Sequence, residues 1–159
     1  MIAGASSGIL YDMSKKPAVQ ETERRIRVLI VDDRSRSRDG LRALLSTWPQ
    51  VEVIGEAQDG REAVLLVEQW QPHVVLMDAR MPGMDGVNAT RLIKARWPST
   101  KVIVLTIYAA YRASALAAEA DAFLVKGCPA EDLLKAIVNH LNTPLADLTL
   151  RLGQGSLAA

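Results

Sequence analysis

Five short, mostly apolar runs divide this chain, and most of them end at an acid, a hydroxyl or a lysine. They cover residues 26–31, 51–57, 73–77, 102–105 and 122–125. Runs of this length that are rich in valine, isoleucine and leucine are typical of strands buried on both faces, as in a parallel sheet. The chain is therefore predicted to build a sheet with helices on both sides.

The segments between these runs have the apolar spacing of amphipathic helices. The first segment repeats its apolar side chains at i, i+3, i+4 and i+7 before Pro49, with Leu41, Leu44, Leu45 and Trp48 on one face. Further helices are predicted over 60–70, 86–96, 109–120 and 129–141. The alanine-rich segment 109–120 is expected to bury little surface, through Ala113, Leu116, Ala117 and Ala120.

Five alternations of strand and helix define an α/β fold. We expect the flavodoxin-like, doubly wound (βα)5 class, with right-handed crossovers and a five-stranded parallel sheet in the order 2-1-3-4-5. That order brings the carboxyl ends of strands one, three and five around one crevice. Asp32, Asp33, Asp78 and Lys126 would then meet at that edge of the sheet.

Length and composition indicate one domain. The 159 residues, 49% of them hydrophobic, suit a single core over residues 26–142, with a flexible arm over 1–25 and a tail without an output domain over 143–159. A net charge of +1 gives no general drive toward nucleic acid or membrane. The single cysteine, Cys128, excludes an internal disulfide framework and agrees with a cytoplasmic location.

Asp78 is the candidate reaction centre, because it ends the run His73–Met77 and precedes the turn Met81-Pro82-Gly83. Taken alone, an acid at the end of a strand is more often a turn or capping residue, and the pair Asp32-Asp33 could also cap a helix. Three carboxylates brought together need a counter-charge, however, and hard oxygen ligands suit Mg²⁺. Thr106 and Lys126, at the ends of two further predicted strands, strengthen the case for a functional site.

Together with the three acids, these residues resemble the motifs of one known family. Asp32-Asp33 follows the first strand, Asp78 stands in Leu-Met-Asp-Ala-Arg-Met-Pro-Gly-Met-Asp-Gly, Thr106 follows the fourth strand, and Lys126 ends Asp-Ala-Phe-Leu-Val-Lys. Residues 26 to about 141 resemble the CheY-like receiver domain of two-component response regulators. Two further stretches, Arg38-Asp-Gly-Leu-Arg-Ala-Leu-Leu and Lys126-Gly-Cys-Pro, resemble receivers of the NarL/FixJ type.

The resemblance implies a phosphorylation site. Asp78 would attack the phosphohistidine of a histidine kinase, or of a phosphotransfer protein, and form an aspartyl phosphate. Mg²⁺ would be bound directly by Asp33 and Asp78, through water by Asp32, and by the backbone carbonyl of Arg80. The chain would phosphorylate itself from donors and lose the phosphoryl group slowly, but it would not be an enzyme.

Three other residues would bind the phosphoryl group or respond to it. Lys126 would pair with one phosphoryl oxygen, and the Thr106 hydroxyl would move to bond another. Phe123 matches the aromatic switch position of the family, so it would turn inward and reshape the face formed by helix four, strand five and helix five. A downstream protein target would recognise that face, and a homodimer is left open.

Several positions depart from the common family pattern. Arg80 and Tyr108 are bulky and lie two residues beyond Asp78 and Thr106, so we hypothesise that they slow hydrolysis by blocking water. Ile107 could crowd the approach of donors. A basic rim is predicted for Arg34, Arg36 and Arg38, against the simpler alternative of a solvated helical turn.

The residues by themselves are compatible with several functions. We expect a stand-alone receiver that acts through protein contact and binds neither nucleic acid nor membrane, because no recognition helix fits within 143–159. The alternative is a fragment of a DNA-binding regulator of the NarL/FixJ type. A phosphohydrolase of the haloacid-dehalogenase type would need Asp-x-Asp after its first strand, where this chain has Arg34 in the second position. An interaction module that works without phosphorylation is a third alternative.

Overall fold

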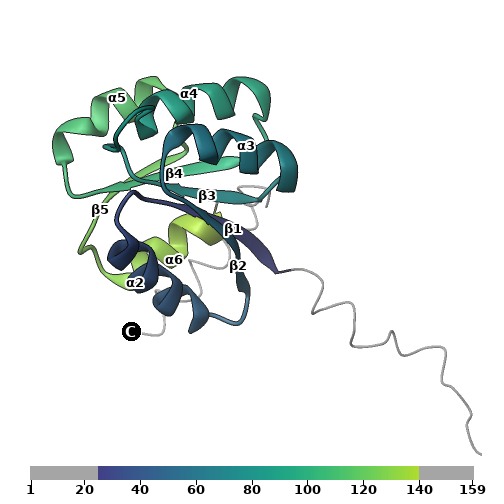
Figure 1. Ribbon diagram of the computed structural model, residues 1–159. Helices are drawn as coiled ribbons and strands as arrows, with labels where there is room; N and C mark the ends of the chain where they lie inside the picture. Colours follow the sequence, from purple (N-terminus) through teal and green to yellow (C-terminus); the bar gives the residue numbers. More distant parts are fainter. Residues whose placement is uncertain (1–24, 140–159) are drawn as a thin grey trace, which may run out of the picture.

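The five predicted strands form one parallel sheet in the order β2-β1-β3-β4-β5, which confirms the predicted topology (Figure 1). The computed structural model describes residues 25–139, so the predicted tail, and the predicted arm apart from Arg25, lie outside the described residues. The strands are β1 (Ile26–Val31), β2 (Val51–Ala57), β3 (Val74–Met77), β4 (Lys101–Thr106) and β5 (Ala122–Val125). The helices are α2 (Ser35–Ser46), α3 (Gly60–Trp70), α4 (Gly86–Arg96), η2 (Ala109–Tyr111), α5 (Arg112–Ala117) and α6 (Ala130–Asn139).

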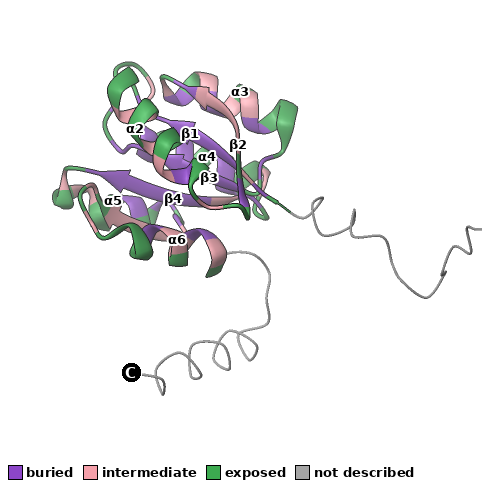
Figure 2. Ribbon diagram, turned by 90° about the horizontal axis from the view of Figure 1, so that it is seen from below, coloured by how far each residue is buried: buried purple, intermediate pink, exposed green. Residues whose placement is uncertain are grey.

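Helices cover both faces of the sheet. Helices α3, α4 and α5 lie on one face, and α2 and α6 lie on the other (Figure 1). Alternate residues of each central strand supply the two cores: Leu29 and Val75 pack toward the first group of helices, while Val28 and Val74 pack toward α2 and α6. The central strands are buried, between helices with exposed outer faces (Figure 2). This explains why the sequence shows continuous apolar runs instead of alternation.

Capping residues fix the starts of helices α3 and α4. The Asp59 carboxylate accepts a hydrogen bond from the Glu62 backbone N–H at 2.8 Å, and the Asp85 carboxylate accepts one from the Asn88 N–H at 2.8 Å. Each bond satisfies an N–H group that would otherwise lack a partner in the first helical turn. The cap at Asp85 fixes the end of the loop that follows Asp78.

The alanine-rich segment differs from its prediction. Instead of one helix over 109–120, the short turn η2 precedes a six-residue α5. Ala120 is buried as predicted, and so are Ala115 and Ala118, whereas Leu116 is 49% exposed and Ala113 and Ala117 are exposed too. Tyr111, Ala115 and Ala118 form a second apolar row at helical spacing. The partly buried Tyr111 packs against the core, and this row faces inward.

Helices α4 and α2 differ in detail from what their apolar spacing predicts. Leu92 shares the helical spacing of the apolar residues Ala89 and Ile93 in α4, yet it is 39% exposed, and Lys94 is buried instead. Helix α2 ends at Ser46, so Trp48 lies beyond it, where it packs against the α2 and α6 side of the core. Trp48 thus faces the core as its spacing predicted, together with Leu41, Leu44 and Leu45, whereas at Leu92 packing against neighbouring elements overrides the local spacing.

Candidate functional site

The carboxyl ends of three strands bring the predicted acids and the lysine together. The backbone N–H of Asp78 donates to the carbonyl of Val31 at 2.9 Å, and the N–H of Lys126 donates to the carbonyl of Thr106 at 2.9 Å. These bonds continue the ladders of the sheet one residue beyond the strands. Side chains far apart in the sequence are therefore held at one edge, as the predicted strand order requires.

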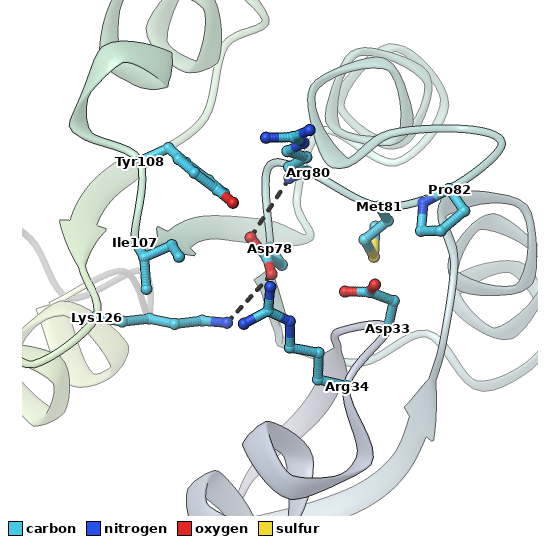
Figure 3. Close-up of a pocket in the computed structure, with 9 residues that line it drawn as sticks. All are labelled: Asp33, Arg34, Asp78, Arg80, Met81, Pro82, Ile107, Tyr108 and Lys126. Atoms are coloured by element: carbon cyan, nitrogen blue, oxygen red, sulfur yellow. Dashed lines mark hydrogen bonds and ion pairs between the residues drawn. The ribbon is translucent and has the colours of Figure 1, made fainter.

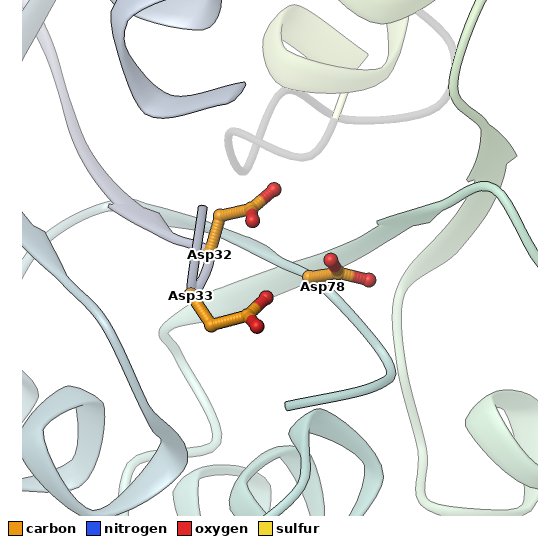
Figure 4. Close-up of side chains that lie close together, drawn as sticks. All are labelled: Asp32, Asp33 and Asp78. Carbon is orange, nitrogen blue, oxygen red and sulfur yellow. The ribbon is translucent and has the colours of Figure 1, made fainter. Parts of the chain in front are cut away.

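Three carboxylates form a compact cluster at this edge (Figure 4). One carboxylate oxygen from each of Asp32, Asp33 and Asp78 lies within 4.8 Å of the others. Asp32 and Asp78 are only 1% and 7% exposed, whereas Asp33 is exposed. A buried group of hard oxygen donors that retains one solvent-facing member fits Mg²⁺, which binds few carboxylates and keeps several waters.

Lys126 supplies a fixed positive charge to the cluster. Its Nζ lies 2.5 Å from Asp32 Oδ2 and 3.1 Å from Asp78 Oδ2 (Figure 3 shows the second contact). Burial by itself would lower the pKa of Lys126, but the ion pairs with Asp32 and Asp78 raise it above its ordinary value. The amine therefore stays charged at neutral pH and holds Asp78 in position in this state.

The pKa of Asp32 is lowered, although this carboxyl group is buried. Burial by itself would raise the pKa of this carboxyl, but hydrogen bonds from Lys126, Ser37 and the Arg34 backbone hold it below its ordinary value. Asp32 is therefore a carboxylate at neutral pH although it is almost inaccessible to solvent. An ionised carboxylate is the form that can bind a cation directly or through water.

The two predicted switch residues lie on adjacent strands. Thr106 is fully buried, and its hydroxyl oxygen is 3.4 Å from the backbone N–H of Tyr108, which donates to it. Phe123 is partly buried and packs against the core on the α3, α4 and α5 side. The structure thus shows where both side chains lie, and their roles as switch residues stay a prediction.

Asp78 opens into a pocket of about 390 Å³ (Figure 3). Its lining residues are Asp33, Arg34, Asp78, Arg80, Met81, Pro82, Ile107, Tyr108 and Lys126. The Arg80 guanidinium carbon lies 5.2 Å from the centre of the Tyr108 ring, a cation–π contact across the pocket mouth. Arg80 and Tyr108 therefore flank Asp78 as the sequence predicted, and their effect on hydrolysis stays a prediction.

Met81 and Pro82 were predicted only as turn residues, yet both line the pocket. Their place directly after Asp78 was the available signal, because a loop that leaves the carboxyl end of a strand borders the crevice there. The predicted basic rim holds only for Arg34. Arg36 borders a separate groove between α2 and α6, and the Arg38 side chain donates to the backbone oxygen of Asp32 at 2.7 Å.

A five-stranded sheet in the order 2-1-3-4-5, with carboxylates and a lysine at its carboxyl edge, defines the class of CheY-like α/β proteins. The family model described as "Response regulator receiver domain" matches residues 28–138, and the chain belongs to this family. No helix within residues 25–139 has the length and apolar character to cross a membrane.

Curated relatives are transcriptional regulators. The chain is 38% identical to the transcriptional regulatory protein DegU of Brevibacillus brevis, over 74% of this chain and 51% of DegU. It is 42% identical to the transcriptional regulatory protein LiaR of Bacillus subtilis, over 70% of this chain and 54% of LiaR. The chain thus spans about half the length of the curated relatives it matches.

Solved structures with the same fold are receiver domains. The response regulator domain of Thermotoga maritima CheB superposes with a TM-score of 0.69 at 33% identity, covering 76% of this chain and 98% of that domain. The signal receiver domain of the putative response regulator NarL from Mycobacterium tuberculosis gives 0.68 at 33% identity, covering 72% and 94%. Both coverages agree with a receiver over the described residues.

Proposed function

We propose that Asp78 accepts a phosphoryl group from a sensor histidine kinase or a phosphotransfer protein and so switches the conformation of this receiver. The observation that carries the proposal is the buried Asp78 carboxylate, held 3.1 Å from Lys126 beside two further acids and open to a pocket. Such an arrangement offers a nucleophile together with charges that oppose those of a phosphoryl group.

Each side chain has a distinct role in this proposal. Asp32, Asp33 and Asp78, with the backbone carbonyl of Arg80, would hold Mg²⁺, which neutralises negative charge on the transferring group. An Asp78 oxygen forms the new bond to phosphorus, while the bond from phosphorus to the donor's leaving atom breaks. Lys126 then bonds a phosphoryl oxygen. In the present structure Lys126 is already beside Asp78, so only a small movement is needed.

The phosphorylated state differs from the free state through Thr106 and Phe123. The Thr106 hydroxyl moves toward a phosphoryl oxygen, and Phe123 fills the space that it vacates. Phe123 lies in β5, so its rotation changes the face formed by α5, β5 and α6. The chain undergoes self-phosphorylation and slow loss of the phosphoryl group without turning over a substrate, and therefore we propose that it is not an enzyme.

We propose that this receiver regulates a DNA-binding output of the NarL/FixJ type, in the cytoplasm. The relatives that are named transcriptional regulators extend to about twice the matched length, which favours this alternative over the stand-alone receiver. The receiver itself would contact protein partners, and a homodimer is one of them. DNA binding would belong to the output domain.

Acetyl phosphate and Mg²⁺ provide the direct test. The wild-type protein is expected to gain the mass of one phosphoryl group by intact mass spectrometry, and to gain none when EDTA removes Mg²⁺. Asp78→Asn keeps the size of the side chain but removes the nucleophilic oxygen, so it should stay unmodified. Phosphorylation of Asp78→Asn at the wild-type rate would refute the assignment of the acceptor.

Arg80 and Tyr108 are expected to lengthen the life of the phosphoryl group. Removing either side chain opens the pocket mouth to water, so Arg80→Ala and Tyr108→Ala should each hydrolyse the acyl phosphate about two- to tenfold faster, a change of roughly 1 kcal/mol in barrier. Hydrolysis is followed by intact mass after the donor is removed. Arg91→Ala, on the exposed surface of α4, is the control. Equal half-lives in all four proteins would contradict the gating role.

A further inference from the structure

The pocket around Asp78 is lined by cations that do not all pair with its acids. Three of its lining side chains are cationic: Arg34, Arg80 and Lys126. Lys126 is paired with Asp32 and Asp78, and Arg80 lies against the Tyr108 ring. No ion pair between described residues involves Arg34. Its guanidinium is therefore available to a ligand.

Arg34 is exposed and lines the pocket, and its backbone is fixed beside the acids. The Arg34 N–H donates to Asp32 Oδ1 at 2.9 Å, so its Cα is tied to the acid cluster. Figure 3 shows the side chain reaching from the start of α2 toward Asp78. Arg34 does not cap α2 through its side chain, and the first turn of α2 contains no acid. The positive end of this helix therefore adds to the charge at the same rim.

We propose that Arg34 binds the dianionic phosphoryl group of the incoming donor before transfer. The inference rests on the proposed function of Asp78 and assigns a residue that binds the phosphoryl group of the donor. A guanidinium can give two parallel hydrogen bonds to phosphoryl oxygens, which a lysine cannot, and it is always charged. Arg34 approaches from the α2 side, whereas Lys126 approaches from β5, so the two cations hold different oxygens.

The transfer step balances without a further reactant. The Asp78 carboxylate bonds to phosphorus, the bond between phosphorus and the acetate oxygen of acetyl phosphate breaks, and acetate leaves as an anion. With phosphoramidate in its zwitterionic form the phosphorus–nitrogen bond breaks and neutral ammonia leaves. The phosphoryl group is common to both donors, and the leaving groups differ in charge. Comparing the two donors therefore separates binding of the phosphoryl group from binding of the leaving group.

The experiment measures initial phosphorylation rates of the full chain with each donor at fixed Mg²⁺. For Arg34→Ala we expect the slope of rate against donor concentration to fall about tenfold with both donors, as for the loss of one hydrogen-bonded charge. Arg34→Lys should recover part of the loss. Arg36→Ala removes the same charge only two residues further along the chain, but Arg36 borders the α2–α6 groove, so this variant should keep the wild-type slope.

Each outcome decides the inference. Wild-type slopes for Arg34→Ala with both donors would overturn it, and so would a loss confined to acetyl phosphate, because Arg34 would then bind the leaving carboxylate. A weaker Mg²⁺ affinity of Arg34→Ala by calorimetry, or a lower melting temperature, would show an indirect structural effect and also overturn it. Failure of the wild type to be phosphorylated by either donor would instead count against the proposed function of Asp78.

Discussion

Replacing Gly86 with alanine is expected to destabilise the protein by about 3 kcal/mol or more, because the new methyl group meets the backbone at the site. A Cβ at Gly86 would overlap the carbonyl oxygen of Asp78 and lie 2.7 Å from its carbonyl carbon. The Gly86 N–H also donates to the Ala79 carbonyl at 2.9 Å, which keeps the start of α4 close to the loop. Neither backbone segment can rotate away as a side chain could.

The same substitution should impair phosphorylation beyond its effect on stability. Relieving the overlap moves Asp78 or the loop after it, and a displacement near 1 Å can slow a reaction by about a hundredfold. Urea unfolding measures the first effect, and intact mass with acetyl phosphate measures the second under conditions where the variant is folded. A variant with wild-type stability and rate would show that this close approach does not exist.

Gly40→Ala is the matched control for Gly86→Ala. Gly40 lies within α2, and a Cβ there would meet no atom within 4 Å. Alanine is a better helix former than glycine, so this variant should gain about 0.5 to 1 kcal/mol in free energy of unfolding. Both variants replace glycine with alanine, but their free energies of unfolding should change in opposite directions. The comparison therefore tests whether the lack of room for a Cβ at Gly86 causes the destabilisation.

Removing Asp121 is expected to cost about 3 kcal/mol of stability, because it leaves a buried amine without its counter-ion. Lys94 is 9% exposed, and its Nζ lies 3.0 Å from Asp121 Oδ2. The same oxygen accepts the Val102 N–H at 2.8 Å, so Asp121→Ala also leaves that donor unsatisfied. Lys94 keeps the carbonyls of Pro98 and Thr100, at 2.9 and 3.0 Å, which places the expected loss at the low end for a buried pair.

A second substitution separates charge burial from lost packing. Lys94→Met in the Asp121→Ala background removes the unpaired charge and should recover part of the lost stability. Glu68→Ala, an exposed acid on α3, should change the free energy of unfolding by no more than about 0.5 kcal/mol. If urea unfolding gives Asp121→Ala and Glu68→Ala equal stabilities, the buried pair contributes nothing.

Lys94 also shows where a single sequence is informative and where it fails. Thr90, Ile93, Lys94 and Trp97 follow helical spacing, so a lysine stands within an inward stripe of α4. The spacing thus favours the buried face, whereas the charge of the side chain by itself favours the solvent face. Its burial depends on Asp121, 27 residues away, which only the crossing from β4 through α5 brings beside it.

The functional site likewise has features that the sequence predicts and features that it does not. The acids and Lys126 could be predicted because each follows an apolar run, and a parallel sheet aligns the ends of its strands. The partners of these groups could not. That Arg38 donates to the Asp32 backbone, while Arg34 lines the pocket and Arg36 does not, depends on the angle at which α2 leaves the sheet.

Local chemistry by itself determined the five strands, their parallel order and the identity of the residues at their carboxyl ends. Hydrophobic runs and capping or turn residues act over a few neighbours, so the sequence displays them directly. Tertiary structure alone decided which stripe of the segment 109–120 is buried, that Lys94 is internal, and that Lys126 bridges Asp32 and Asp78. The physical reason is that burial and ion pairing depend on surfaces supplied by distant segments, and these surfaces exist only once the layers have packed.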